Sequence, residues 1–320
     1  MVDKIDLDIL FALDRDPRSP TTRIAENLGL DASTTKRRID RLSSKKNLKF
    51  KAVLFPLGLG WSYVSTLILL DSSIPREMMT NRLNLALDLP YSISVGFGDY
   101  DVNASFFVKA LDHLSNQLEK LNALRGVREA DMALYVPGSQ TRNRPRKFNE
   151  LDWKIVNSLR QDCRKTIGQI AAEVNANSKT VRKYLTMRIG HLVLLHSSFK
   201  PSDLGLIHAL LTIRLREGER YQRVIREVFR LSEEMSVFVH ASNKYSGDFQ
   251  IGLGVYVDTI PRLDEFAEAI RRMPDIFELR KMVISEHIPS VASHKWMEDL
   301  IRQHLHGRRS IPISPTARVT

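Results

Sequence analysis

The 320-residue sequence contains one cysteine, Cys163, and no long hydrophobic run. A single thiol cannot form a disulfide within the chain, and so little cysteine is typical of a reducing compartment. Because no stretch of about 18 apolar residues occurs, we expect no transmembrane helix. The first residues also lack the apolar core of a signal peptide. These absences predict a cytoplasmic protein that does not associate with membranes.

The chain also lacks the residue constellations that many enzymes use. No paired carboxylates, glycine-rich phosphate loop or cluster of metal ligands stands out. The nine histidines are scattered, and His191, His196, His208 and His240 all fall in the second half. We therefore predict no cofactor, no metal ion and no catalytic residues.

Acidic residues are outnumbered, with 37 Asp and Glu against 48 Lys and Arg, and the formal net charge is +11. The excess is concentrated rather than spread. Residues 33–51 contain eight Lys or Arg and one acid, Asp40. Charge gathered on one segment is the electrostatic pattern expected of a surface that binds the phosphates of nucleic acid.

Within that segment, residues 31–42 are predicted to form a short helix with one basic face. Asp31 is a suitable N-cap, because its carboxylate can accept a hydrogen bond from a free amide of the first turn. Thr35, Ile39 and Leu42 share one side of the helix and form a buried stripe. The opposite face carries hydroxyls and cations, which suits the major groove of DNA. Its candidate DNA-binding residues are Ser33, Thr34, Lys36, Arg37 and Arg41.

Another helix precedes this one across a tight turn. Ser19 and Pro20 mark its start, and Gly29 provides a left-handed stop. Two helices joined by a tight glycine turn are typical of a helix-turn-helix, and a further helix over 6–13 completes a small head. After Leu42 we expect a turn and a two-stranded wing. Two of its lysines join the predicted DNA contacts, Lys45 and Lys46.

The head is repeated in the second half. Residues 150–189 match 4–43 without a gap, and Arg18 pairs with Arg164. The basic wing of the second copy is thinner, so we expect the first head to dominate DNA recognition. The candidate DNA-binding residues of the second head are Lys179, Arg182 and Lys183.

A second repeated pattern follows each head. The apolar stretches 63–70 and 207–215 are predicted strands, and each is followed by a helix, two strands, a helix and a last strand. This is the ferredoxin-like order. Such a sheet has one bare face, so we expect the bare faces to pair. The pairing would give at least a dimer of chains, or a monomer that mimics a dimer.

The predicted fold class is therefore α+β, with two winged helix-turn-helix heads that are each followed by a ferredoxin-like βαββαβ domain. A basic linker joins the halves, and a helix and a disordered tail end the chain. The predicted boundaries are 1–55 and 56–136 for the first head and its domain, 137–148 for the linker, 149–200 and 201–288 for the second pair, and 289–320 for the last helix and tail.

This pattern resembles the Lrp/AsnC, or feast/famine, family of prokaryotic transcription regulators. The resemblance rests on the head over 5–42 and on a Gly-x-x-Asp turn at 98–101. The pattern occurs twice, and its two copies together cover nearly the whole chain. The chain departs from the family by fusing two units, and Gln250 replaces the last Asp of the second turn. The resemblance implies a regulator that binds double-stranded DNA, forms homo-oligomers through its sheets and senses a small effector such as an amino acid. The implied effector site comprises Gly98, Asp99, Asp101, Gly247 and Asp248.

The same architecture also resembles the siroheme decarboxylases, which work as paired homologous subunits. Such an enzyme needs a basic pocket for tetrapyrrole carboxylates and histidines that assist catalysis. A third possibility is an assembly protein whose heads no longer bind DNA, but the charge of residues 33–51 argues against it. The sequence favours the DNA-binding regulator, with the decarboxylase as the alternative.

Overall fold

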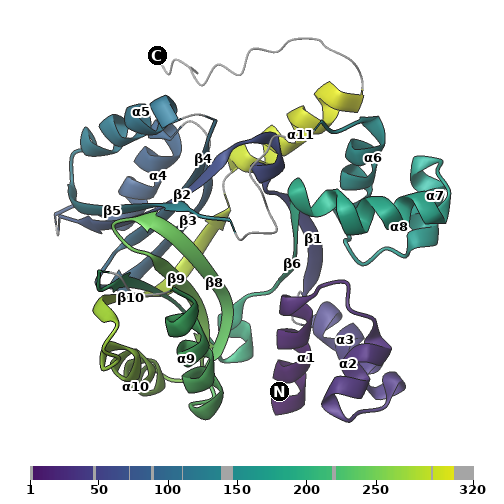
Figure 1. Ribbon diagram of the computed structural model, residues 1–320, viewed down its shortest axis with the longest axis horizontal. Coiled ribbons are helices and arrows are strands. Elements are labelled where there is room, and N and C mark those ends of the chain that lie inside the picture. Colours follow the sequence, from purple (N-terminus) through teal and green to yellow (C-terminus); the bar gives the residue numbers. More distant parts are fainter. Residues whose placement is uncertain are drawn as a thin grey trace.

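The computed structural model describes residues 3–45, 48–71, 73–87, 90–109, 111–137, 147–217, 221–289 and 291–305. Figure 1 shows two small helical heads beside a large β-barrel. Lys46, the side chain of Lys45, most of the predicted linker and the predicted tail from residue 306 lie outside the described residues.

The first head contains α1 (Lys4–Arg15), α2 (Thr21–Leu28) and α3 (Ala32–Lys45). Gly29 ends α2 in the left-handed conformation at φ 64°, which confirms the predicted turn. Two helix boundaries differ from the prediction. Pro20, not Ser19, is the N-cap residue of α2, and α3 continues past Leu42 because no glycine or proline stops it there.

The second head repeats this arrangement in α6 (Glu150–Leu159), α7 (Ile167–Val174) and α8 (Ser178–Met187). Asn175 takes the left-handed position of the turn at φ 52°. Asn177 caps α8, since its side chain accepts a hydrogen bond from the amide of Thr180 at 2.8 Å. Both heads are therefore helix-turn-helix units with a left-handed residue in the turn.

One strand follows each head, and the two strands pair with each other. Strands β1 (Lys49–Leu54) and β6 (Val193–Ser198) run antiparallel. The sequence suggested a two-stranded wing within one head, whereas the structure shows one wing shared by both. Sharing satisfies the backbone groups that each short strand would otherwise leave unpaired.

Each head leads into a four-stranded ferredoxin-like sheet, with strand orders β3-β4-β2-β5 and β8-β9-β7-β10. The first unit comprises β2 (Ser62–Leu70), α4 (Arg76–Ala86), β3 (Pro90–Gly98), β4 (Val102–Val108), α5 (Leu111–Asn122) and β5 (Val127–Tyr135). The second comprises β7 (Ile207–Leu215), α9 (Tyr221–Glu234), β8 (Phe238–Gly247), β9 (Ile251–Val257), α10 (Ile260–Arg271) and β10 (Ile276–Pro289), and α11 (Val291–Leu305) follows it.

The two sheets join at both edges and close into one barrel (Figure 1). Strand β5 pairs with β8, and β10 pairs with β3. Their inner faces share a buried cluster that includes Leu67, Tyr100, Tyr245, Phe249 and Met282. The predicted pairing of bare faces thus takes place within one chain. The expected homo-oligomer required these faces to be free to join two chains. In this structure they are covered within one chain.

Each head packs against the ferredoxin-like unit of the other half. In the first head, Phe11 of α1 stacks on Phe238 of β8, with ring centroids 3.6 Å apart. The core of the second head extends to Phe107 of β4 and Trp296 of α11. Among the described residues, no helix is long and apolar enough to cross a membrane.

Candidate nucleic-acid interface

Helix α3 presents the basic face that the sequence predicted. Thr35, Ile39 and Leu42 are buried, and the hydrogen bond from the amide of Thr34 holds the pKa of the capping Asp31 well below its usual range. Ser33, Lys36 and Arg37 are exposed on the other side, and Thr34 is half-buried. A capped helix with this outward face can place cations and hydroxyls against DNA.

Arg41 differs from the prediction, because its guanidinium pairs with the carboxylate of Asp6 in α1. The Asp6 side chain is fully buried, and Arg38 also contacts it at 2.8 Å. A buried carboxylate needs such partners, since leaving it unpaired is costly. Arg41 therefore helps to hold α3 on α1, and its predicted contact with DNA stays a prediction.

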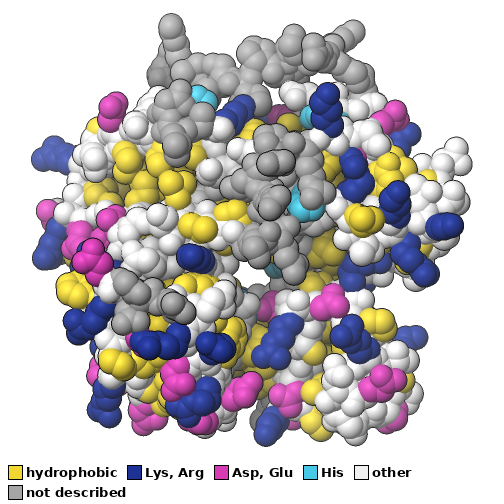
Figure 2. All heavy atoms as spheres, viewed as in Figure 1, with side chains coloured by type: hydrophobic (Ala, Val, Ile, Leu, Met, Phe, Trp, Pro, Cys, Tyr) yellow, Lys and Arg dark blue, Asp and Glu magenta, His cyan; other side chains and the backbone are white. Residues whose placement is uncertain are grey.

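The second head contains the same buried acid with a different arginine. Arg188 grips Asp152 with two hydrogen bonds of 2.7 and 2.6 Å. On α8 the predicted residues Lys179, Arg182 and Lys183 are all exposed. Figure 2 shows Lys and Arg side chains gathered over this head. The second head thus retains a basic outer face.

Two arginines lock the heads to each other. Arg18 donates to the carbonyl oxygens of Cys163 and Lys165, the latter at 3.0 Å. Arg164 donates to those of Pro17 at 2.6 Å and Ser19 at 3.2 Å. The sequence comparison paired Arg18 with Arg164 but gave them no role. Identical arginines at matching positions of the repeat were the available signal.

The two glycine-aspartate turns join the halves of the barrel. The Asp99 carboxylate accepts a hydrogen bond from the amide of Lys281 on β10 at 2.8 Å. In the same way Asp248 accepts from the amide of Met132 on β5 at 2.7 Å. Gly98 is required, because at φ 127° an added Cβ would lie 2.6 Å from the Lys281 oxygen. Three predicted effector residues therefore have a structural role.

The remaining predicted effector residues behave similarly. Asp101 accepts hydrogen bonds from the amide of Leu70 at 2.9 Å and from Arg76 at 2.8 Å. Gln250 makes the equivalent bond to the amide of Leu215 at 2.9 Å, so its replacement of an Asp preserves the turn. Gly247, at φ 140°, has its backbone against Met132 as Gly98 has against Lys281.

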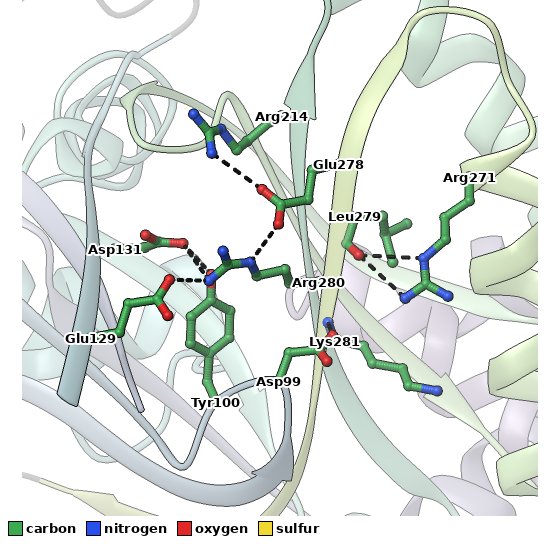
Figure 3. Close-up of polar contacts among 10 residues, drawn as sticks. All are labelled: Asp99, Tyr100, Glu129, Asp131, Arg214, Arg271, Glu278, Leu279, Arg280 and Lys281. Atoms are coloured by element: carbon green, nitrogen blue, oxygen red, sulfur yellow. Dashed lines mark hydrogen bonds and ion pairs between the residues drawn. The ribbon is translucent and has the colours of Figure 1, made fainter. Parts of the chain in front are cut away.

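An open cavity of about 380 Å³ lies beside the first turn. Gly98 and Asp99 line it, together with charged residues of both signs from β5, α10 and β10. Figure 3 shows Arg280 of the cavity lining in contact with Glu129 and Glu278, while Arg271 reaches the carbonyl of Leu279. The lining charged side chains are Asp99, Glu129, Arg271, Glu278 and Arg280.

Two histidines that the sequence treated as scattered meet between the first head and the second unit. The Nε2 atoms of His208 and His240 are 3.0 Å apart, so one ring donates to the other. Burial lowers the pKa of His240 to about 4 and lowers that of His208 as well. Asp14 of α1 lies 3.8 Å from His240 Nδ1, and burial raises its pKa to about 6. Strand pairing brings the rings together, which no local sequence pattern signals.

Comparison with known proteins identifies both heads. Residues 2–43 match the AsnC-type helix-turn-helix domain, and residues 148–187 match a winged helix-turn-helix DNA-binding domain. The transcriptional regulator Ptr1 of Methanocaldococcus jannaschii is 30% identical over 136 residues, which are 42% of this chain and 91% of Ptr1. The chain belongs to the Lrp/AsnC family of helix-turn-helix transcription regulators.

Other similarities concern the family and the fold. The regulator FL11 of Pyrococcus furiosus is 28% identical over 130 residues, covering 40% of this chain and 84% of FL11. The siroheme decarboxylase NirDL is similar in fold over 95% of this chain and all of its own, with a TM-score of 0.53 and 13% identity. Lrp/AsnC relatives thus match less than half of this chain, whereas the double architecture also occurs in NirDL.

Proposed function

We propose that this chain is a transcription regulator that binds double-stranded DNA with α3 as its main reading helix. The observation that carries the proposal is the outward face of α3. Lys36 and Arg37 are exposed, and neither has an ion-pair partner among the described residues. Arginine can hold guanine O6 and N7 with two parallel hydrogen bonds, and lysine can neutralise phosphates.

Equilibrium binding to duplex DNA at several salt concentrations tests this function. Each neutralised phosphate should lower log affinity by about 0.9 per log unit of salt. We expect a steep loss of affinity between about 50 and 200 mM salt and a preference for particular sequences over random DNA. Affinity that does not change with salt would contradict the proposal, and genome-wide mapping of bound DNA would supply the natural sites.

We further propose that an amino-acid-like effector binds the cavity beside Gly98. The cavity offers both carboxylates and guanidinium groups, which suits a ligand with both an ammonium and a carboxylate group. The cavity touches both halves of the chain at the seam of the barrel, by which we mean the junction between its two sheets. A ligand there would therefore stabilise the closed barrel through its contacts with β5, β10 and the Gly98–Asp99 turn.

Thermal unfolding in the presence of each amino acid tests the effector site. We expect at least one amino acid to raise the melting temperature, and Arg271→Ala to abolish that rise. Arg272→Ala is the matched control, because Arg272 is exposed on the same helix end but does not line the cavity. A rise that Arg271→Ala leaves intact would place the ligand elsewhere.

Siroheme decarboxylation is a second candidate function. The hydrogen-bonded pair of His208 and His240 and the fold similarity to NirDL favour it. The Phe11 ring of the first head stacks on Phe238 and Tyr256, and Tyr256 stacks on His240, so the first head packs next to this pair. This packing is why we place the enzyme second.

Anaerobic incubation with siroheme separates the two functions. A decarboxylase would change the absorption spectrum of the tetrapyrrole and reduce its mass by carbon dioxide. The variant His208→Gln/His240→Gln should lose that activity. An unchanged spectrum and mass with the wild type would remove this candidate and leave the regulator.

A further inference from the structure

Two opposite charges stand at equivalent positions of the two halves and face each other in the barrel. The amides of Lys281 on β10 and Met132 on β5 make the same bond to a glycine-aspartate turn of the other half, so these strands correspond residue by residue. Arg280 and Asp131, one residue earlier, are therefore equivalent, and their charged groups lie 3.4 Å apart. In a two-fold arrangement a residue meets its own equivalent only at the axis. Arg280 and Asp131 thus lie at an approximate two-fold axis of the barrel, and we call them the axis pair.

Neighbouring side chains support the axis pair. The Tyr100 hydroxyl donates to the carboxylate of Asp131 (Figure 3). Arg280 donates to Glu129 of the other half at 2.5 Å and to Glu278 of its own strand at 2.8 Å. The side chains of Arg280 and Asp131 are only 25% and 17% exposed. Solvent therefore screens these charges only in part.

Two copies of the same half would lose this complementarity. Two first halves would bring the Asp131 and Glu129 carboxylates of both copies to the axis. They would supply no arginine there, because Leu69, which pairs with Glu129, stands where the second half has Arg214. Two second halves would oppose two Arg280 guanidinium groups and would lack the Glu129 carboxylate. Like charges held this close in a partly buried place oppose association.

We infer that the bare sheet face of each half accepts only the unlike half, whether that half belongs to the same chain or to a second copy. A barrel made from two first halves or two second halves is excluded by the charge at its axis. Every barrel consequently carries one head of each kind. The inference concerns the choice of sheet partner and does not depend on DNA binding.

Charge reversal in the full chain tests the role of the axis pair. Asp131→Arg and Arg280→Asp each place like charges at the axis and should lower the melting temperature by at least about 5 °C. The exchanged variant Asp131→Arg/Arg280→Asp should regain most of that loss, because opposite charges face each other again. Arg226→Asp is the matched control, since it makes the same charge change at an exposed position of α9 and should melt within about 2 °C of the wild type.

Salt separates charge repulsion from a simple misfit of the new side chains. The screening length falls from about 10 Å at 0.1 M salt to about 3 Å at 1 M. The deficit of each single reversal relative to the wild type should therefore shrink at 1 M salt. Single reversals that melt with the wild type, an exchanged variant no more stable than the single ones, or a deficit that salt leaves unchanged would each contradict the inference.

Refolding the two single variants together tests the choice of partner directly. Each variant alone has like charges at its axis, whereas two chains that exchange halves have opposite charges at both axes. Light scattering should therefore find more of a species with about twice the mass of one chain in the mixture than in either variant alone. Equal amounts in all three samples, or monomers only, would overturn the inference. If a single reversal fails to fold alone, folding of the exchanged variant supports the inference and its failure contradicts it.

Discussion

At the scale of single residues, the outward positions of α3 were predictable but their partners were not. Helical spacing places Lys36, Arg37 and Arg41 on the polar side of the buried stripe. Spacing cannot show whether an arginine points to solvent or toward an acid on another helix. Asp6 is that acid, and it pairs with Arg41. Arg37 remains exposed and free to read a base.

Replacing each of these arginines should separate stability from recognition. Arg41→Ala removes a partner of buried Asp6 and should lower the free energy of unfolding by roughly 1–3 kcal/mol. Arg37→Ala should leave it within about 0.5 kcal/mol, because the side chain is exposed. Urea unfolding of both variants checks this. Equal stability of Arg41→Ala and the wild type would mean that the Asp6 pair contributes nothing.

At the scale of elements, the strands were predicted in order but the pairing between the two sheets was not. Strand β8 extends to Gly247 and β10 to Pro289. Their C-terminal residues pair with β5 and β3, respectively, and so join the two sheets. Because such pairing joins residues far apart in the chain, local alternation cannot reveal it. The sequence indicated the Gly-Asp turns but not their place between the two sheets, since good turn chemistry suits a ligand loop and a strand junction equally well.

The junction between β3 and β10 makes Gly98 sensitive to substitution. Gly98→Ala should lower the free energy of unfolding by roughly 1–3 kcal/mol or more, because alanine is strained at φ 127° and its Cβ meets the backbone of Lys281. Gly190→Ala is the control, since no atom lies within 4 Å of an added Cβ there. Urea unfolding should show a loss for the first variant only. Similar values for both would show that the turn adapts.

The histidine pair makes the first head acid-sensitive. A lowered pKa means that His208 and His240 bind protons more readily when unfolded, so acid favours unfolding from about pH 6.5 down toward the folded value, about 4 for His240. Asp14, whose pKa is raised to about 6, takes up a proton in the folded state and offsets one of the two histidines. We expect a net loss of up to about 1.4 kcal/mol per pH unit between pH 6 and 5.

Urea unfolding at pH 7, 6 and 5 measures this loss. The variant His208→Gln/His240→Gln should lose less stability over the same range than the wild type. Parallel pH profiles for the two proteins would show that the pair does not cause the sensitivity.

At the scale of the whole molecule, duplication, domain order and fold class were predictable, because they follow from a repeat that spans most of the chain. The cross-packing of each head on the opposite unit was not, since it depends on contacts such as Phe11 with Phe238. The closed barrel covers within one chain the sheet faces that family resemblance assigned to a dimer. Light scattering should therefore give a mass near 36.6 kDa. A dimer at low micromolar concentration would show that another surface associates.

The central claim is that α3 of the first head reads DNA in a chain whose two heads are unequal. The most direct measurement compares wild type, Arg37→Ala and Lys183→Ala on one selected duplex at one salt concentration. Arg37→Ala should weaken binding by about 1–3 kcal/mol and relax the preference at one base position, because a bidentate contact with guanine is lost. Lys183→Ala should weaken binding less. Wild-type affinity for Arg37→Ala would contradict the claim, and equal damage by Lys183→Ala would show that the chain acts as a symmetric dimer.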